Sequence, residues 1–146
     1  MVAGGTGLAP LRAVLEQIDR GWGTAGSGPR VHLFHGSRMA WNLYDDHYLT
    51  RLATKPWFGY TPVVSEDPTY RGTRGLVGTV AANAGDWSDR TAMVCGSPEM
   101  VRHTVQELRA AGVPAAAIRR EQFDFLQGTE LDDTVEIPVV AEDTKR

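Results

Sequence analysis

The sequence predicts an α/β fold, a three-layer open parallel sheet of about five strands with helices on both faces. Short apolar runs that suit strands alternate along the chain with amphipathic stretches that suit helices. Glycine turns join two of the expected strands to helices, in "GGTGLAP" and "VCGSPEM", as crossover connections of parallel sheets require. We expect the strand order 3-2-1-4-5.

The amino-terminal half supplies three expected strands and two helices. Only Met1, Val2 and Ala3 precede the first glycine turn, so the first strand is expected to be short. Residues 8–20 predict a helix, because five apolar side chains share one face: Leu8, Leu11, Val14, Leu15 and Ile18. The further expected elements are a loop over 21–30, a strand over 31–36, a helix over 42–54 and a strand over 60–65.

The carboxyl-terminal half begins with an expected loop over 66–75, and residues 76–83 suit either a short helix or a strand. An apolar strand is expected over 91–96. A helix follows over 97–112, with Ser97 as its cap, Pro98 in its first position and Gly112 at its end. The last strand is expected over 117–123.

We assign residues 1–123 to one nucleotide-binding domain and residues 124–146 to an acidic, partly irregular extension. In that extension, "VEIPVV" suits an extended edge that packs back on the domain, and the last residues are otherwise expected to fray.

Composition narrows the function classes. The chain has 146 residues, 42% of them hydrophobic, which suits one globular domain. Its net charge of −3 gives no reason to expect nucleic acid or a membrane surface as partner. No apolar run approaches the roughly 20 residues that span a bilayer, and no signal-peptide pattern is present, so we expect a cytoplasmic location. The single cysteine and the spacing of the four histidines match no metal motif.

The turn "GGTGLAP" suits a diphosphate. Glycine lets the backbone approach a ligand closely, and the helix that follows points free N–H groups and its positive dipole end at the turn. The pattern from Gly5 is G-x-G-x-x-P, whereas the usual dinucleotide fingerprint has glycine or alanine in the sixth place. The alternative is a tight turn that only joins a strand to a helix.

The turn "VCGSPEM" has the same architecture. Both glycine turns follow expected strands, and ligands of open parallel sheets bind outside the carboxyl ends of the strands, where the strand order reverses. If the strand order reverses between these two strands, the two turns face one crevice. For Cys95 alone, the alternative is a small buried apolar side chain.

Five motifs in fixed order resemble the nicotinamide-binding part of the ferredoxin–NADP⁺ reductase family. The motifs are "GGTGLAP", "HLFHGSR" with "LYDD", "VVSEDP" with "RGLVG", "VCGSPEMV" and "REQF". The family includes the reductase components of oxygenases and the reductase part of flavohaemoglobins. The resemblance covers residues 1 to 123.

The resemblance implies a role for each matching residue. It implies that the first turn holds the diphosphate and that the cysteine–glycine turn lies beside the site of hydride transfer. The implied nucleotide-binding residues of these two turns are Gly5, Thr6, Gly7, Pro10, Gly96, Ser97 and Pro98. The implied catalytic residues are Cys95, Glu121 and Phe123, a thiol, a carboxylate and an aromatic ring beside the reacting rings.

The choice between NADH and NADPH depends on the turns after the second and third strands. Relatives that prefer NADP often have serine and then arginine after the third strand, whereas this chain has Ser65, Glu66 and Asp67. Carboxylates repel a 2′-phosphate and suit ribose hydroxyls. Arg38, which follows Ser37 after the second strand, argues the other way. We expect NADH to be preferred; the alternative for "SEDP" is an ordinary capped turn.

The resemblance further implies a parent flavoprotein. We expect an FAD-binding domain to precede Met1 in that parent, so that this chain alone would not hold FAD tightly. Electrons would pass from the flavin to a haem, an iron–sulfur centre or an oxygenase protein. A non-catalytic nucleotide-sensing or protein-docking domain is the alternative. A flavodoxin-like FMN carrier fits less well, because "GGTGLAP" has only one threonine.

Overall fold

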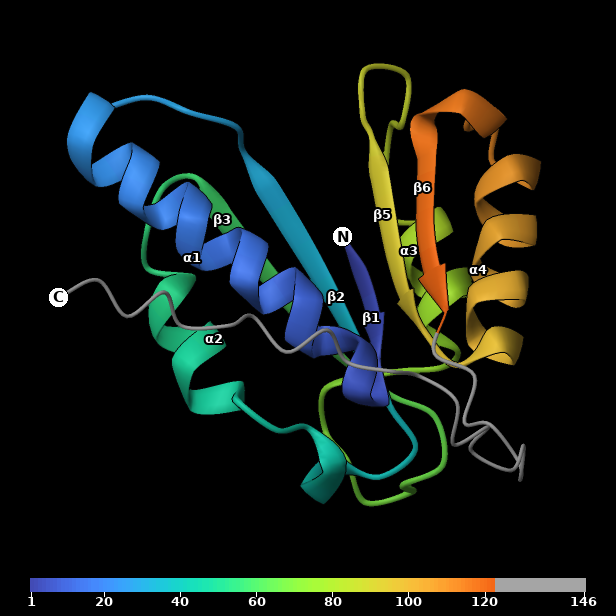
Figure 1. Cartoon of the computed structure of the whole chain (residues 1–146). Coiled ribbons are helices and arrows are strands. Elements are labelled where there is room, and N and C mark those ends of the chain that lie inside the picture. Colours follow the sequence, from blue (N-terminus) through green and yellow to red (C-terminus); the bar gives the residue numbers. More distant parts are fainter. Residues whose placement is uncertain (123–146) are drawn as a thin grey trace, which may run out of the picture.

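The computed structural model describes residues 1–122, which form a parallel sheet between two layers of helices (Figure 1). Its strands are β1 (Val2–Gly4), β2 (Val31–Ser37), β3 (Phe58–Val64), β4 (Thr73–Arg74), β5 (Ala92–Gly96) and β6 (Ile118–Gln122). Its α-helices are α1 (Leu8–Ala25), α2 (Asp46–Leu52), α3 (Val77–Ala82) and α4 (Pro98–Ala110). Short 3₁₀ turns are η1 (Gly5–Gly7), η2 (Ala40–Asn42) and η3 (Ala115–Ala117). Phe123 and the expected extension over 124–146 lie outside the described residues.

The sheet confirms the predicted topology. Its order is β4-β3-β2-β1-β5-β6, and its neighbouring strands are parallel. The five expected strands therefore stand in the predicted order, with β1 between β2 and β5. The additional edge strand β4 lies inside the expected loop 66–75, and its two residues are too few to give a period that the sequence could reveal.

Helix α1 is longer than predicted. The expectation of a loop throughout 21–30 is wrong for residues 21–25, which continue the helix. Trp22, which lies in this added part of α1, packs against the core beneath the helix. Its indole N–H donates to the Pro29 carbonyl at 3.0 Å. The helix ends at Gly26, whose φ of 68° is typical of a left-handed cap. Packing of one tryptophan thus overrides the low helix propensity of its glycine neighbours.

The expectation of a helix over 42–54 is wrong for residues 43–45 and 53–54, because the helix covers only 46–52. A 3₁₀ turn over η2 is followed by α2, and Asp45 between them has a φ of 58°. For residues 76–83 the sequence suited either a short helix or a strand, and the structure has the helix α3 there.

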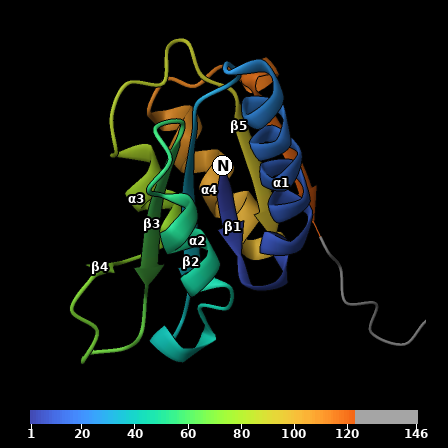
Figure 2. The same ribbon diagram turned by 90° about the vertical axis from the view of Figure 1, so that its left-hand side faces the viewer.

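Apolar side chains cover both faces of the sheet, as the three-layer prediction requires. One core cluster lies under α1 and α2 and includes Leu11, Leu15 and Leu49. The other lies under α3 and α4 and includes Val77, Val101 and Leu108. Figure 2 shows α1 on one side of the strands and α3 on the other. Between Met1 and Gln122, no helix combines the length and apolar character needed to cross a membrane.

Candidate functional site

The predicted turns meet at one edge of the sheet because the strands that precede them are parallel. The register places Gly4 of β1 beside Gly36 of β2 and Ala3 of β1 beside Cys95 of β5. Cys95 in turn lies beside Glu121 of β6. The carboxyl ends of these strands therefore bring the glycine turns together around β1.

The first turn combines an open side with a tightly packed side. Gly5 has a φ of 52° and no atom within 4 Å of the position of a Cβ, and Gly5 and Thr6 are exposed. A Cβ on Gly7 would lie 2.2 Å from the carbonyl oxygen of Cys95. Glycine is thus required at Gly7 for close approach to β5 and is favoured at Gly5 by the positive φ. Pro10 lies in the first turn of α1, as predicted.

Met100 joins the two glycine turns from the α4 side. Its methyl carbon lies 2.7 Å from the position of a Cβ on Gly4 and equally near that of a Cβ on Gly96. The two glycines thus leave the space that the methionine fills. Met100 is the last residue of the motif "GSPEM" in the sequence. Its contact with both turns can be inferred only once the strand order is known.

The amino end of α1 has no side chain of its own as a cap, and Tyr44 lies against it. The Leu8 and Ala9 amides lie near the Tyr44 oxygen and act to lower the pKa of its phenol, but burial and then Asp45 outweigh them and raise that pKa. Tyr44 also meets the buried ring of His35 edge-on, with the ring centroids 5.6 Å apart. Nothing in the spacing of the sequence indicated Tyr44.

Cys95 is buried among the side chains beneath α1. Burial is the largest cause that raises the pKa of its thiol, and the Glu121 carboxylate raises it further. The thiol is therefore protonated at neutral pH and acts as a small, close-packed group. Glu121 is exposed beside it. The third predicted catalytic residue, Phe123, lies outside the described residues.

The turns after β2 and β3 are bonded to each other. The Ser65 amide donates to the Ser37 carbonyl at 3.0 Å, and the Glu66 amide donates to the Arg38 carbonyl at 2.8 Å. The Arg38 Nε also lies 3.7 Å from the Glu66 Oε1, with both side chains well exposed. The two residues that pointed to opposite cofactor preferences therefore form one ion pair.

Two other predicted residues have structural partners. The buried Asp67 carboxylate accepts hydrogen bonds from the amide and the hydroxyl of Thr69, which lower its pKa. Ser97 is the N-cap of α4, and its hydroxyl accepts from the Met100 amide at 3.4 Å, while Pro98 is the first residue of the helix. A contact of Asp67, Ser97 or Pro98 with a nucleotide stays a prediction.

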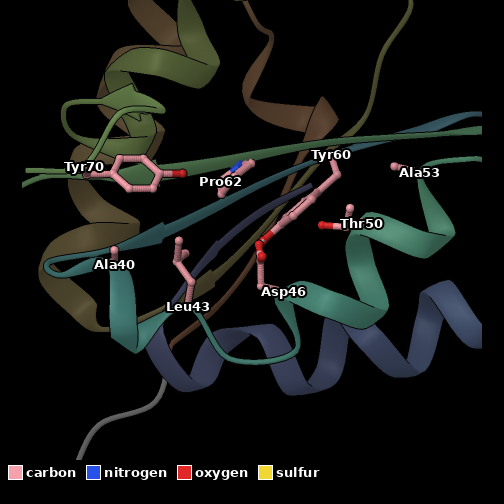
Figure 3. Close-up of a pocket in the computed structure, with 8 residues that line it drawn as sticks. All are labelled: Ala40, Leu43, Asp46, Thr50, Ala53, Tyr60, Pro62 and Tyr70. Carbon is pink, nitrogen blue, oxygen red and sulfur yellow. The ribbon is translucent and has the colours of Figure 1, made fainter.

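A pocket of about 510 Å³ lies beside these turns, between α2 and the strand β3. In Figure 3 the Tyr60 hydroxyl points to Asp46, and Tyr70 stands beyond Pro62. The hydroxyl donates to the Asp46 carboxylate at 2.9 Å. Burial and this carboxylate raise the Tyr60 pKa far above its usual range. The sequence did not predict this pocket, whose residues come from separate segments.

No group of three or more histidine, cysteine or acidic side chains among residues 1–122 is placed to hold a metal ion.

Comparison with known proteins agrees with this architecture. The family model for the oxidoreductase NAD-binding domain matches residues 1–106. The chain is 35% identical to the reductase subunit of an aromatic O-demethylase from Amycolatopsis, over 84% of this chain and 36% of that protein. It is 31% identical to the electron transfer component of toluate 1,2-dioxygenase from Pseudomonas putida, with the same shares. The chain thus spans about a third of the length of these relatives.

Solved structures extend the comparison. A cytochrome P450 reductase from Amycolatopsis matches with a TM-score of 0.66 and 32% identity, over 84% of this chain and 36% of that one. The cytochrome b5 reductase domain of Ulva prolifera nitrate reductase matches with a TM-score of 0.70 and 18% identity, over 83% and 47%, which shows the shared fold. The chain belongs to the oxidoreductase NAD-binding domain family, within the ferredoxin reductase-like oxidoreductases.

Proposed function

We propose that this chain binds NAD(H) at the carboxyl edge of its sheet and orients the nicotinamide toward an FAD held by a separate domain. The convergence of the two glycine turns carries the proposal. Gly7 packs against the Cys95 carbonyl, so the exposed Gly5 and Thr6 lie beside the turn that follows β5. The two bound cofactors would supply the hydride chemistry, and this chain would supply binding and orientation.

Each part of the edge has a proposed task. The turn over Gly5–Gly7 and the amino end of α1 would hold the diphosphate, because backbone N–H groups and the helix dipole favour an anion there. Tyr44 lies against the Leu8 and Ala9 amides, so a phosphate that reached these amides would displace its hydroxyl. The protonated Cys95 and the small Gly96 would let a flat ring approach closely, with Glu121 beside them.

The Arg38–Glu66 pair supports a preference for NADH. A 2′-phosphate near Arg38 would have to displace Glu66 or lie next to its negative charge. Ribose hydroxyls could instead donate to the same carboxylate.

The relatives suggest the redox partners. Their names describe a reductase subunit of an O-demethylase and an electron transfer component of a dioxygenase. We infer that electrons received by the FAD pass to a haem, iron–sulfur or oxygenase protein. The cytoplasmic location expected from the sequence stays a prediction.

Calorimetric titration with NAD⁺, NADH and NADPH tests the function and the preference together. We expect NADH to bind more tightly than NADPH. The variant Glu66→Gln should increase NADPH affinity by roughly 3- to 10-fold, since it leaves Arg38 without its carboxylate partner. Glu107→Gln on the carboxyl-terminal half of α4 is the matched control and should change neither affinity.

The possible results distinguish the proposed function, the preference for NADH and the alternative of a protein-docking domain. Folded protein that binds none of the nucleotides would refute the proposed function. Tighter binding of NADPH than of NADH by the unchanged chain would refute the preference alone. Dimerisation that depends on protein concentration and ignores nucleotides would favour a protein-docking domain.

A further inference from the structure

The pocket between α2 and β3 contains a carboxylate that has no cationic partner among residues 1–122. Asp46, the first residue of α2, forms no salt bridge with a basic side chain in this part of the chain. Its neighbour Asp45 instead pairs with Arg12 at 2.5 Å. The two adjacent carboxylates therefore differ: one is paired with a residue of α1, and the other lines the pocket.

One oxygen of Asp46 is held by a tyrosine. The Tyr60 hydroxyl donates to its Oδ1 at 2.9 Å, and the raised pKa of this phenol keeps it a donor at neutral pH. Figure 3 shows these two groups meeting inside the pocket, with the Thr50 side chain beside them. A carboxylate accepts more hydrogen bonds than this one, so Asp46 keeps acceptor capacity for a ligand.

Aromatic and small apolar side chains form most of the wall around this carboxylate. Tyr60 and Tyr70 are both half-buried. Burial and then the charge of Asp46 raise the pKa of Tyr70, so the carboxylate lies near both phenols. Apart from Thr50, the remaining lining residues are Ala40, Leu43, Ala53 and Pro62. Asp46 therefore carries the one charge among the eight residues that line the pocket.

The pocket extends away from the carboxyl edge where the candidate nucleotide site lies. β3 ends at Val64, and a strand rises about 3.3 Å per residue, so Tyr60 lies roughly 13 Å before the end of this strand. Thr50 belongs to the second half of α2, and Ala53 follows that helix. The carboxylate and its tyrosine are therefore separate from the turns at 37–38 and 65–66 that concern the cofactor preference.

These groups favour a planar organic cation as ligand. A lone carboxylate repels anions, and an uncharged apolar ligand would cover it at a cost in free energy without giving it a partner. An amidinium or guanidinium group has parallel N–H bonds that match the two oxygens of a carboxylate. Flat cations are also attracted to the faces of tyrosine rings. The volume of about 510 Å³ is in the usual range for small ligands.

We propose that this pocket binds a small organic cation whose amidinium or guanidinium head group donates to Asp46 and lies against Tyr60 and Tyr70. The short apolar body of the ligand packs against Leu43 and Pro62, which line the same pocket. The proposal does not depend on nucleotide binding.

An NMR titration of the whole chain with two matched compounds tests the proposal. Benzamidine is the cationic probe, and benzamide is its uncharged analogue of nearly the same size. We expect benzamidine to bind with a Kd of roughly 1–10 mM, as suits one partly screened charge pair. It should shift the amide signals of residues 46–53 and 58–62, which surround the pocket. Benzamide should bind at least about fivefold more weakly.

Three variants locate the binding. Thr50 is exposed and lies four positions after Asp46 on α2, where an acidic–basic pair supports a helix. Thr50→Lys should therefore cover the carboxylate without unfolding the chain and weaken benzamidine binding at least about fivefold. Thr54→Lys adds the same charge at an exposed position outside the lining and should leave the affinity within about twofold. Asp46→Asn keeps the size of the side chain and should weaken binding by roughly 5- to 20-fold.

Several results would overturn the proposal. One is a folded chain that shows no response to benzamidine up to roughly 20 mM. Others are equal affinity for benzamide, or a benzamidine affinity that neither Thr50→Lys nor Asp46→Asn changes. Saturation with NADH should not displace benzamidine, and displacement would show that the pocket belongs to the nucleotide site instead. Failure of NADH binding alone would refute the proposed function, whereas benzamidine binding would still support the cation site.

Discussion

Replacement of Gly7 by alanine would test whether the two glycine turns must touch. The new Cβ would lie 2.2 Å from the Cys95 carbonyl oxygen and 2.6 Å from the Gly96 nitrogen, and these are backbone atoms that cannot rotate away. Relief requires the turn to move by more than 1 Å, since ordinary contacts begin near 3.4 Å. Because the φ of Gly7 is −61°, alanine causes no backbone strain, and the whole effect is steric.

We expect Gly7→Ala to lower the free energy of unfolding by about 2–4 kcal/mol, as overpacking at immobile atoms does. Urea unfolding followed by circular dichroism measures that loss, and calorimetry should show weakened NADH binding. Gly21→Ala is the matched control. Gly21 lies inside α1 with nothing within 4 Å of a new Cβ, so alanine there should stabilise the chain by about 0.5–1 kcal/mol. A loss below about 0.5 kcal/mol for Gly7→Ala would refute the contact between the turns.

Three further predictions concern the side chains of His35, Met100 and Asp67. His35 is fully buried, and burial lowers its pKa to about 4. As the pH drops from 6.5 to 4, the unfolded chain therefore binds a proton at this position before the folded chain does. The free energy of unfolding should fall by roughly 3 kcal/mol over that range. His35→Phe should flatten that part of a urea-unfolding profile against pH, and a slope that stays the same in this variant would contradict the role of His35. Met100→Ala should cost about 1–3 kcal/mol in the same assay and weaken NADH binding, because a cavity opens between the glycine turns. Asp67→Ala should lower the midpoint of thermal unfolding, because the Asp67 carboxylate bonds to Thr69. The affinity for NADH should stay near that of the unchanged chain. A loss of NADH affinity without a loss of stability would instead show that Asp67 contacts the nucleotide.

The strands and their parallel connections were predictable because the signals for them are local. The expected strands over 31–36 and 91–96 are apolar runs followed by glycine turns, and parallel connection of such units leaves few topologies. The glycine turns were predictable for the same reason, since the positive φ of Gly5 favours glycine and the close approach of Gly7 to β5 leaves no room for a Cβ.

Contacts between distant segments were not predictable. Met100 reaches both glycine turns only because β5 lies beside β1. Tyr44 reaches the amino end of α1 only because the segment after β2 returns to that helix, where Asp45 pairs with Arg12. The end of α1 was mispredicted because Trp22 gains more from packing than its glycine neighbours lose in helix propensity. Each of these features depends on the sheet order being established first.

The cofactor preference shows how pairing changes the interpretation of single residues. In the sequence, Arg38 argued for a phosphate and Glu66 against it, as if each acted alone. In the structure they lie 3.7 Å apart and are exposed, so water and salt screen their attraction and the pair resists a phosphate only weakly. The discrimination it provides should therefore be about tenfold or less and should shrink as salt is added. A preference much larger than tenfold that persists at 0.5 M salt would require other residues to select the cofactor.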